Sequence, residues 1–225
     1  MAKFAEIGRA AIPGQGTELR LLQRNDEFSI RIVGQPGDLM NSRLHGSEDA
    51  LAELACADVA TRPGARVLVG GLGMGFTLAA ALATLGSDAE VVVAELVPEV
   101  VDWNRGPLGQ AAGRPLDDPR TRVHVGDVAA LMRDSPGGFD AIMLDIDNGP
   151  EGMTRKDNDL VYSPRGLESA QRALRQDGVL AVWSAGRDAG FSERLKRVGF
   201  SVSEHQVRAH RPGKGARHVI WLGLV

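Results

Sequence analysis

The sequence is poor in cysteine, in long apolar runs and in charge of one sign, and each shortage excludes a class of protein. Its 225 residues include one cysteine, Cys56, so a disulfide framework or a cysteine metal cluster within the chain is excluded. The 26 basic and 29 acidic residues are interspersed, which favours neither a nucleic acid nor a membrane surface as partner. No apolar run reaches the roughly 18 residues of a membrane-spanning helix. We expect a cytoplasmic protein with one main domain.

Motifs for metal binding and for hydrolysis are also missing. The five histidines are scattered and form no pair at ligand spacing beside acidic residues, so the sequence predicts no metal site. There is no Gly-x-Ser-x-Gly elbow and no phosphate-binding loop that ends in Gly-Lys-Ser/Thr. These absences count against a hydrolase and against a nucleoside triphosphatase.

From residue 67 onward, short apolar runs alternate with helical patterns, which is typical of βαβ units. Between the last two expected strands no convincing helix is found, so we expect these two strands to pair antiparallel at the edge of the sheet. The prediction is an α/β fold with a doubly wound, mostly parallel, seven-stranded sheet of the Rossmann-like methyltransferase kind. Its expected strands lie near 67–69, 91–94, 122–125, 141–144, 179–183, 200–207 and 218–224.

The chain begins with a different pattern. Residues 18–23 and 28–33 have strand character and flank Asn25-Asp26, which is a turn signal, so we expect a β-hairpin. Residues 1–40 are therefore predicted to form a small appendage, and residues 41–225 the Rossmann-like domain. At the start of that domain Ser47, with Glu48 and Asp49 after it, is expected to open a helix.

A glycine-rich turn follows the first strand of the predicted domain. The stretch from Val67 to Leu78 runs from an apolar strand through Gly71, Gly73 and Gly75 into a helix. Glycines allow a tight turn and a close approach of the backbone to a ligand, because a β-carbon would occupy that space. A purely structural tight turn is the alternative.

Acidic residues close the next strands. Glu95 follows the second strand, where a carboxylate can accept hydrogen bonds from both ribose hydroxyls. Gly126 and Asp127 close the third, where Asp127 can accept a hydrogen bond from an adenine amino group. A solvated strand end or a helix cap is the alternative for Glu95, and an N-cap of the following helix, which is compatible with a ligand contact, is the alternative for Asp127. Because ligands bind at the carboxyl ends of parallel strands, the combined pattern predicts a nucleoside site.

The fourth strand ends at Asp145, and a long polar segment follows it to Tyr162. This segment carries Asp147 and is expected to form a loop that closes over a pocket. Carboxylates there can bind a cationic amine, orient its lone pair and accept its proton. Asp145 and Asp147 are the predicted catalytic residues.

These motifs together resemble the spermidine synthase family of polyamine aminopropyltransferases, within the class I methyltransferase fold. The resemblance implies that Glu95 holds the ribose, Asp127 the adenine end and Asp145 the amine. Aligning the glycine loop puts Met74 where the family has an aspartate that holds the donor's ammonium group. The tyrosine and the glutamine or histidine of the family are replaced by Ser47 and Glu48.

We therefore predict a transferase that uses S-adenosylmethionine or its decarboxylated form as donor, bound by Gly71, Gly73, Met74, Gly75, Glu95, Gly126, Asp127 and Asp145. Met74 favours methyl transfer to a small acceptor such as an amine, because an aspartate there would repel the donor's carboxylate. Aminopropyl transfer from the decarboxylated donor is the alternative. A nicotinamide-dependent oxidoreductase and a non-catalytic nucleoside-binding protein are further alternatives, and a homodimer stays open.

Overall fold

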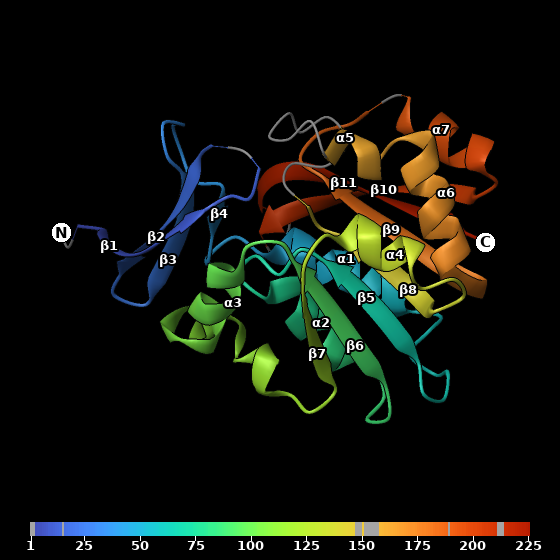
Figure 1. Ribbon diagram of the computed structural model, residues 1–225, viewed down its shortest axis with the longest axis horizontal. Helices are drawn as coiled ribbons and strands as arrows, with labels where there is room; N and C mark the ends of the chain where they lie inside the picture. Colours follow the sequence, from blue (N-terminus) through green and yellow to red (C-terminus); the bar gives the residue numbers. More distant parts are fainter. Residues whose placement is uncertain (1–2, 15, 147–149, 151–157, 189, 211–213) are drawn as a thin grey trace.

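The computed structural model describes residues 3–14, 16–146, 150, 158–188, 190–210 and 214–225. Its main sheet has the strand order β10-β11-β9-β8-β5-β6-β7 (Figure 1). All neighbours pair parallel except β11, which is antiparallel to both β9 and β10. This confirms the predicted seven-stranded sheet and its antiparallel edge. The strands are β5 (Arg66–Gly70), β6 (Glu90–Glu95), β7 (Thr121–Val125), β8 (Phe139–Leu144), β9 (Leu174–Ser184), β10 (Ser201–His210) and β11 (Lys214–Leu224).

Helices cover both faces of this sheet because its strands are apolar on both sides. In β5, Val67 and Val69 belong to one buried cluster and Leu68 to the other. The first cluster includes side chains of α1 (Gly46–Cys56), α2 (Phe76–Thr84) and α3 (Pro98–Arg105). The second includes side chains of α4 (Val128–Arg133), α6 (Pro164–Ala173) and α7 (Phe191–Val198). The shorter helices are α5 (Asn158–Val161), η1 (Pro107–Ala112) and η2 (Pro115–Asp117).

The amino-terminal part forms a separate four-stranded antiparallel sheet in the order β1-β2-β3-β4. The predicted hairpin is β2 (Glu18–Arg24) with β3 (Glu27–Ile32), and β1 (Ala5–Ala11) and β4 (Met40–Asn41) extend it on either side. The sequence pattern missed β1 because only Ala10 of that strand is buried, which leaves no alternation of apolar and polar residues.

The small sheet shares its core with the larger one. Leu21, Phe28 and Ile30 are buried in the same cluster as the apolar faces of α1, α2 and α3. The two parts therefore pack together through apolar side chains, while a domain boundary near residue 40 stays a proposal. An isolated two-stranded hairpin is only marginally stable, and both the added strands and this packing stabilise it.

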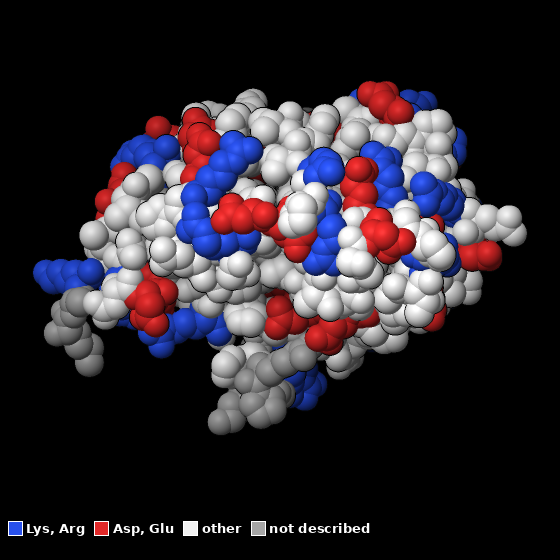
Figure 2. Space-filling view, turned by 90° about the horizontal axis from the view of Figure 1, so that it is seen from below, with Lys and Arg blue, Asp and Glu red and all other residues white. Residues whose placement is uncertain are grey.

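The surface agrees with the balanced charge of the sequence. On the face shown in Figure 2, Lys and Arg side chains are interspersed with Asp and Glu side chains rather than gathered in a patch of one sign. In the described part of the chain, every helix is too short or too polar to span a membrane.

Candidate active site

The glycine turn between β5 and α2 is built so closely that side chains are excluded. A Cβ on Gly71 would lie 2.4 Å from the backbone oxygen of Asp145, and the residue has φ +92°. Gly73 has φ +51°, and its Cβ would lie 3.0 Å from the Met40 sulfur. Both glycines line a cavity, so the structural and the ligand-binding interpretations of this turn coexist.

Gly75 differs from the other two glycines. It precedes α2 with φ +85°, and a Cβ there would face Pro115 and Asn104. It lines neither of the two cavities described below. Its role among the described residues is therefore to begin α2, and its predicted contact with the donor is not supported by the geometry.

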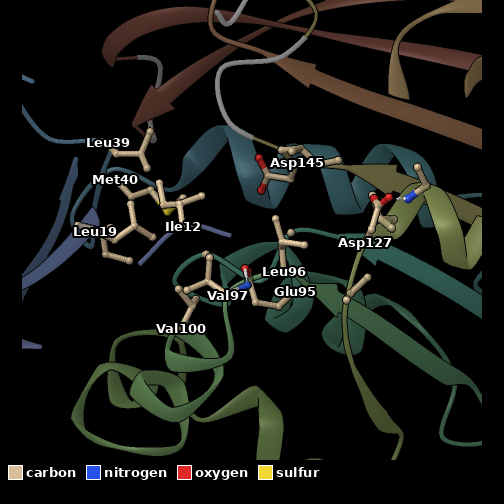
Figure 3. A pocket seen from close by; sticks show the side chains of 18 of the residues that line it. Ile12, Leu19, Leu39, Met40, Glu95, Leu96, Val97, Val100, Asp127 and Asp145 are labelled. Carbon is tan, nitrogen blue, oxygen red and sulfur yellow. Dashed lines mark hydrogen bonds between the residues drawn. The ribbon is translucent and has the colours of Figure 1, made fainter. Parts of the chain in front are cut away.

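A first cavity, of about 400 Å³, lies at the carboxyl ends of β5, β6, β7 and β8 (Figure 3). This is the edge where parallel strands of open α/β sheets bind ligands. Figure 3 shows carboxylates on one side and apolar side chains of the small sheet on the other. The predicted residues that line it are Gly71, Gly73, Glu95, Gly126, Asp127 and Asp145.

Glu95 closes β6 with a carboxylate held by the backbone. Leu72 N–H donates to Oε2 at 3.0 Å and Val97 N–H donates to Oε1 at 2.9 Å. Burial raises the pKa of Glu95 above its ordinary value, and these backbone donors act in the opposite direction. The carboxylate is thus fixed in orientation at the end of β6 by backbone donors.

Asp127 both caps a helix and borders the cavity. Its Oδ1 accepts a hydrogen bond from Ala129 N–H at 2.9 Å, which makes it the N-cap of α4. It also lines the first cavity beside Gly126. The predicted alternatives of cap and ligand contact are therefore compatible.

A second cavity, of about 560 Å³, adjoins the first. The two share the lining residues Leu39, Met40, Gly73 and Asp145, so one site continues into the other. Trp183 from β9 and His218 from β11 form part of its wall, with ring centroids 4.8 Å apart. An aromatic wall of this kind suits the binding of a cation.

Two carboxylates in the second cavity have raised pKa values. Burial raises the pKa of Asp145 to about 6, and the hydrogen bond from Thr77 Oγ1 to its Oδ2, at 2.6 Å, lowers it. Burial and the neighbouring Asp145 raise the pKa of Glu48 to about 7, and the hydrogen bond from Ser47 lowers it. Among the described residues, no lysine or arginine forms an ion pair with either group. Within the described part of the chain, the site therefore holds carboxylates that no lysine or arginine neutralises.

The outcome for Met74 and Asp147 differs from that for the other predicted site residues. Met74 lines the second cavity but is 4% exposed and belongs to the hydrophobic core. Asp147, predicted to be catalytic, lies outside the described residues.

Three side chains of the site were not predicted to act there. Glu48 was expected to open a helix but lines the second cavity, and Thr77 orients Asp145. Asn104 is buried on α3 and donates from Nδ2 to the Gly73 and Val100 carbonyl oxygens, each at 2.9 Å. In the sequence, Asn104 could have been noticed as a polar residue on an otherwise apolar face of α3. Its hydrogen bond to the glycine turn explains why an amide is buried there.

The strand order, the glycine turn and the acidic strand ends define a class I methyltransferase-like α/β fold. Spermidine synthase from Thermotoga maritima has this fold: its crystal structure matches 99% of this chain and 74% of its own with a TM-score of 0.75, at 17% sequence identity. Residues 54–186, more than half of the chain, match the model of the spermine/spermidine synthase domain. The chain belongs to the spermine/spermidine synthase family.

Curated relatives are similar over part of their length. The polyamine aminopropyltransferase of Mycobacterium tuberculosis strain H37Rv is 32% identical over 127 residues, which are 55% of this chain and 23% of that protein. The spermine synthase of Arabidopsis thaliana is 36% identical over 96 residues, which are 42% of this chain and 25% of that protein. The chain spans about a quarter of the length of the curated relatives it matches.

Proposed function

We propose that this chain is an aminopropyltransferase, which moves the aminopropyl group of decarboxylated S-adenosylmethionine onto a small cationic amine. One observation carries the proposal: Glu48 and Asp145 place two carboxylates, with no arginine or lysine partner among the described residues, in a cavity that continues from the first one. The names of the curated relatives support the same chemistry.

The charge of the second cavity favours the decarboxylated donor. Because Gly73 and Asp145 border both cavities, the tail of a donor in the first cavity would reach the second near Asp145. The decarboxylated tail carries an ammonium group, which Asp145 attracts, whereas the ordinary donor adds a carboxylate that Asp145 repels. The presence of Met74 in place of an aspartate favoured methyl transfer. This argument is outweighed, because carboxylates from other elements supply the negative charge that Met74 lacks.

The remaining lining residues suit a nucleoside. Glu95 lines the first cavity and can accept hydrogen bonds from the ribose hydroxyls, and Asp127 can accept one from the adenine amino group. Leu96, Val97 and Val128 give an apolar surface for the base. These roles are the ones that the family resemblance implies.

In the reaction, the acceptor nitrogen attacks the methylene carbon next to the sulfonium. A C–N bond forms, the C–S bond breaks, and its electron pair stays on sulfur, which leaves as a neutral thioether. Since sulfonium is a good leaving group, holding the two reactants in line supplies most of the catalysis. The acceptor must first lose a proton, because an ammonium nitrogen has no lone pair.

Calorimetric titrations with the two donors test this proposal. We expect the decarboxylated donor to bind about fivefold more tightly than S-adenosylmethionine at low salt, as about 1 kcal/mol of charge discrimination gives in a partly solvated site. Mass spectrometry should then detect aminopropylated product from a linear diamine. Tighter binding of S-adenosylmethionine together with a methylated amine would establish the methyltransferase alternative instead, and binding of NAD alone the oxidoreductase.

A further inference from the structure

A short hydrogen-bonded chain holds Glu48 in the second cavity. Ser47 Oγ donates to Glu48 Oε2 at 2.6 Å, and His218 Nδ1 lies 2.9 Å from the same Ser47 oxygen. Ser47 is completely buried, whereas Glu48 and His218 both border the cavity. These hydrogen bonds join α1 to β11, which are far apart in the sequence.

The hydrogen-bond donors in this chain all point toward Glu48. Ser47 has one hydroxyl proton and gives it to the carboxylate, so His218 Nδ1 must carry the proton of the second bond. Burial lowers the pKa of His218, which favours the neutral imidazole. The chain therefore stabilises Glu48 as a carboxylate and keeps it ready to accept a proton.

Other charged groups around the cavity are already paired. Glu27 lies 2.6 Å from an Arg24 nitrogen, and Asp38 lies 2.7 Å from an Arg31 nitrogen. Arg43, the arginine that borders the same cavity, lies 3.2 Å from Glu27. Among the described residues that line this cavity, these pairs leave Glu48 and Asp145 as the carboxylates that a cationic ligand would meet.

Glu48 and Asp145 differ in where they lie. Asp145 borders both cavities and its Oδ2 is occupied by Thr77, whereas Glu48 borders the second cavity alone. Asp145 can thus contact donor and acceptor, and Glu48 the acceptor.

We propose, resting on the aminopropyltransferase function above, that Glu48 binds the ammonium group of the acceptor and takes the proton that its nitrogen must lose, with Ser47 and His218 as positioning residues. The proton passes from the acceptor ammonium to a Glu48 oxygen. The freed lone pair forms the C–N bond, the C–S electron pair stays on sulfur, and the product is a secondary ammonium. Glu48 then returns its proton to solvent.

The test is steady-state kinetics with the decarboxylated donor and putrescine as acceptor, together with calorimetric titration of the donor. Glu48→Gln keeps the shape but not the base, and we expect kcat to fall about 100-fold or more while donor affinity stays within twofold. The acid limb of the pH–kcat/KM profile for putrescine should also be lost. Wild-type kcat and KM for putrescine in this variant would overturn the proposal.

Variants of Ser47 and His218 test the hydrogen bonds that hold Glu48 without removing Glu48 itself. Ser47→Ala should lower kcat/KM for putrescine about 10- to 100-fold, as expected for a lost hydrogen bond to a charged group. His218→Phe should do the same, whereas His218→Asn, whose amide can donate in place of Nδ1, should recover most of the activity. Equal losses in the Phe and Asn variants would contradict the positioning role.

A matched control lies on β10, where Ser203 Oγ and His205 Nε2 are 3.0 Å apart at an exposed place that borders neither cavity. Ser203→Ala should leave the kinetics unchanged. If the wild type fails to bind the decarboxylated donor or to aminopropylate any amine, both the proposed function and the inference about Glu48 are contradicted. Transfer that is insensitive to Glu48→Gln would contradict the inference alone.

Discussion

Replacing Glu48 by glutamine should change how the stability of the unliganded protein depends on pH. The pKa of Glu48 is raised from 4.5 to about 7, so between these values Glu48 keeps its proton in the folded state and loses it in the unfolded chain. The folded state then binds more protons, and the free energy of unfolding falls as pH rises through this window. A pKa rise of that size corresponds to about 3 kcal/mol.

Glutamine resembles the protonated glutamate and can still accept the hydrogen bond from Ser47, but it cannot ionise. We therefore expect Glu48→Gln and wild type to unfold at similar urea concentrations at pH 4.5. At pH 8 the variant should be more stable by about 2 to 3 kcal/mol. Asp145 raises the pKa of Glu48, so the glutamine also changes the titration of Asp145, and the difference between the two proteins reports the coupled pair.

The measurement is urea unfolding followed by tryptophan fluorescence at pH 4.5, 6, 7 and 8 without ligand. Glu53→Gln is the matched control, because Glu53 lies on the same helix with an exposed side chain. It should follow the wild type at every pH. If the curves of Glu48→Gln and wild type stay parallel from pH 4.5 to pH 8, the assignment of raised proton affinity to Glu48 is refuted.

Three further changes test the site. Gly71→Ala places a Cβ 2.4 Å from a carbonyl oxygen and should lower the free energy of unfolding in urea by about 3 kcal/mol. Its control, Gly64→Ala, is also at positive φ but has open space and should lower it by about 1 kcal/mol, so equal losses would contradict the steric argument. Glu95→Gln should weaken methylthioadenosine binding by about 1.5 to 3 kcal/mol in calorimetry, whereas Glu90→Gln at the other end of β6 should leave it unchanged. Unchanged affinity in the Glu95→Gln variant would remove Glu95 from the nucleoside site. Thr77→Val removes the hydrogen bond that lowers the pKa of Asp145, so NMR titration should find that pKa above about 6, and no rise would contradict this role for Thr77.

The sequence by itself determined the main sheet and the edge at which the site lies. Apolar runs of strand length alternated with helical periodicity, and that local pattern is enough to predict parallel strands with helices on both faces. Because carboxyl ends of parallel strands meet at one edge, Glu95, Asp127 and Asp145 could be placed together before any contact was known. The closeness of the Gly71 turn to Asp145 agrees with the same logic.

The tertiary structure alone decided which way the remaining side chains face. Glu48 has the sequence context of a helix-opening acid, and only the packing of α1 against α2 and the main sheet places it at the second cavity. Gly75 has the same local signal as Gly71 but packs near Pro115 and Asn104 and lines neither cavity. Ser47 meets His218 from a strand near the other end of the chain. Local patterns fix backbone conformation, whereas burial, charge pairing and pKa depend on neighbours that are distant in sequence.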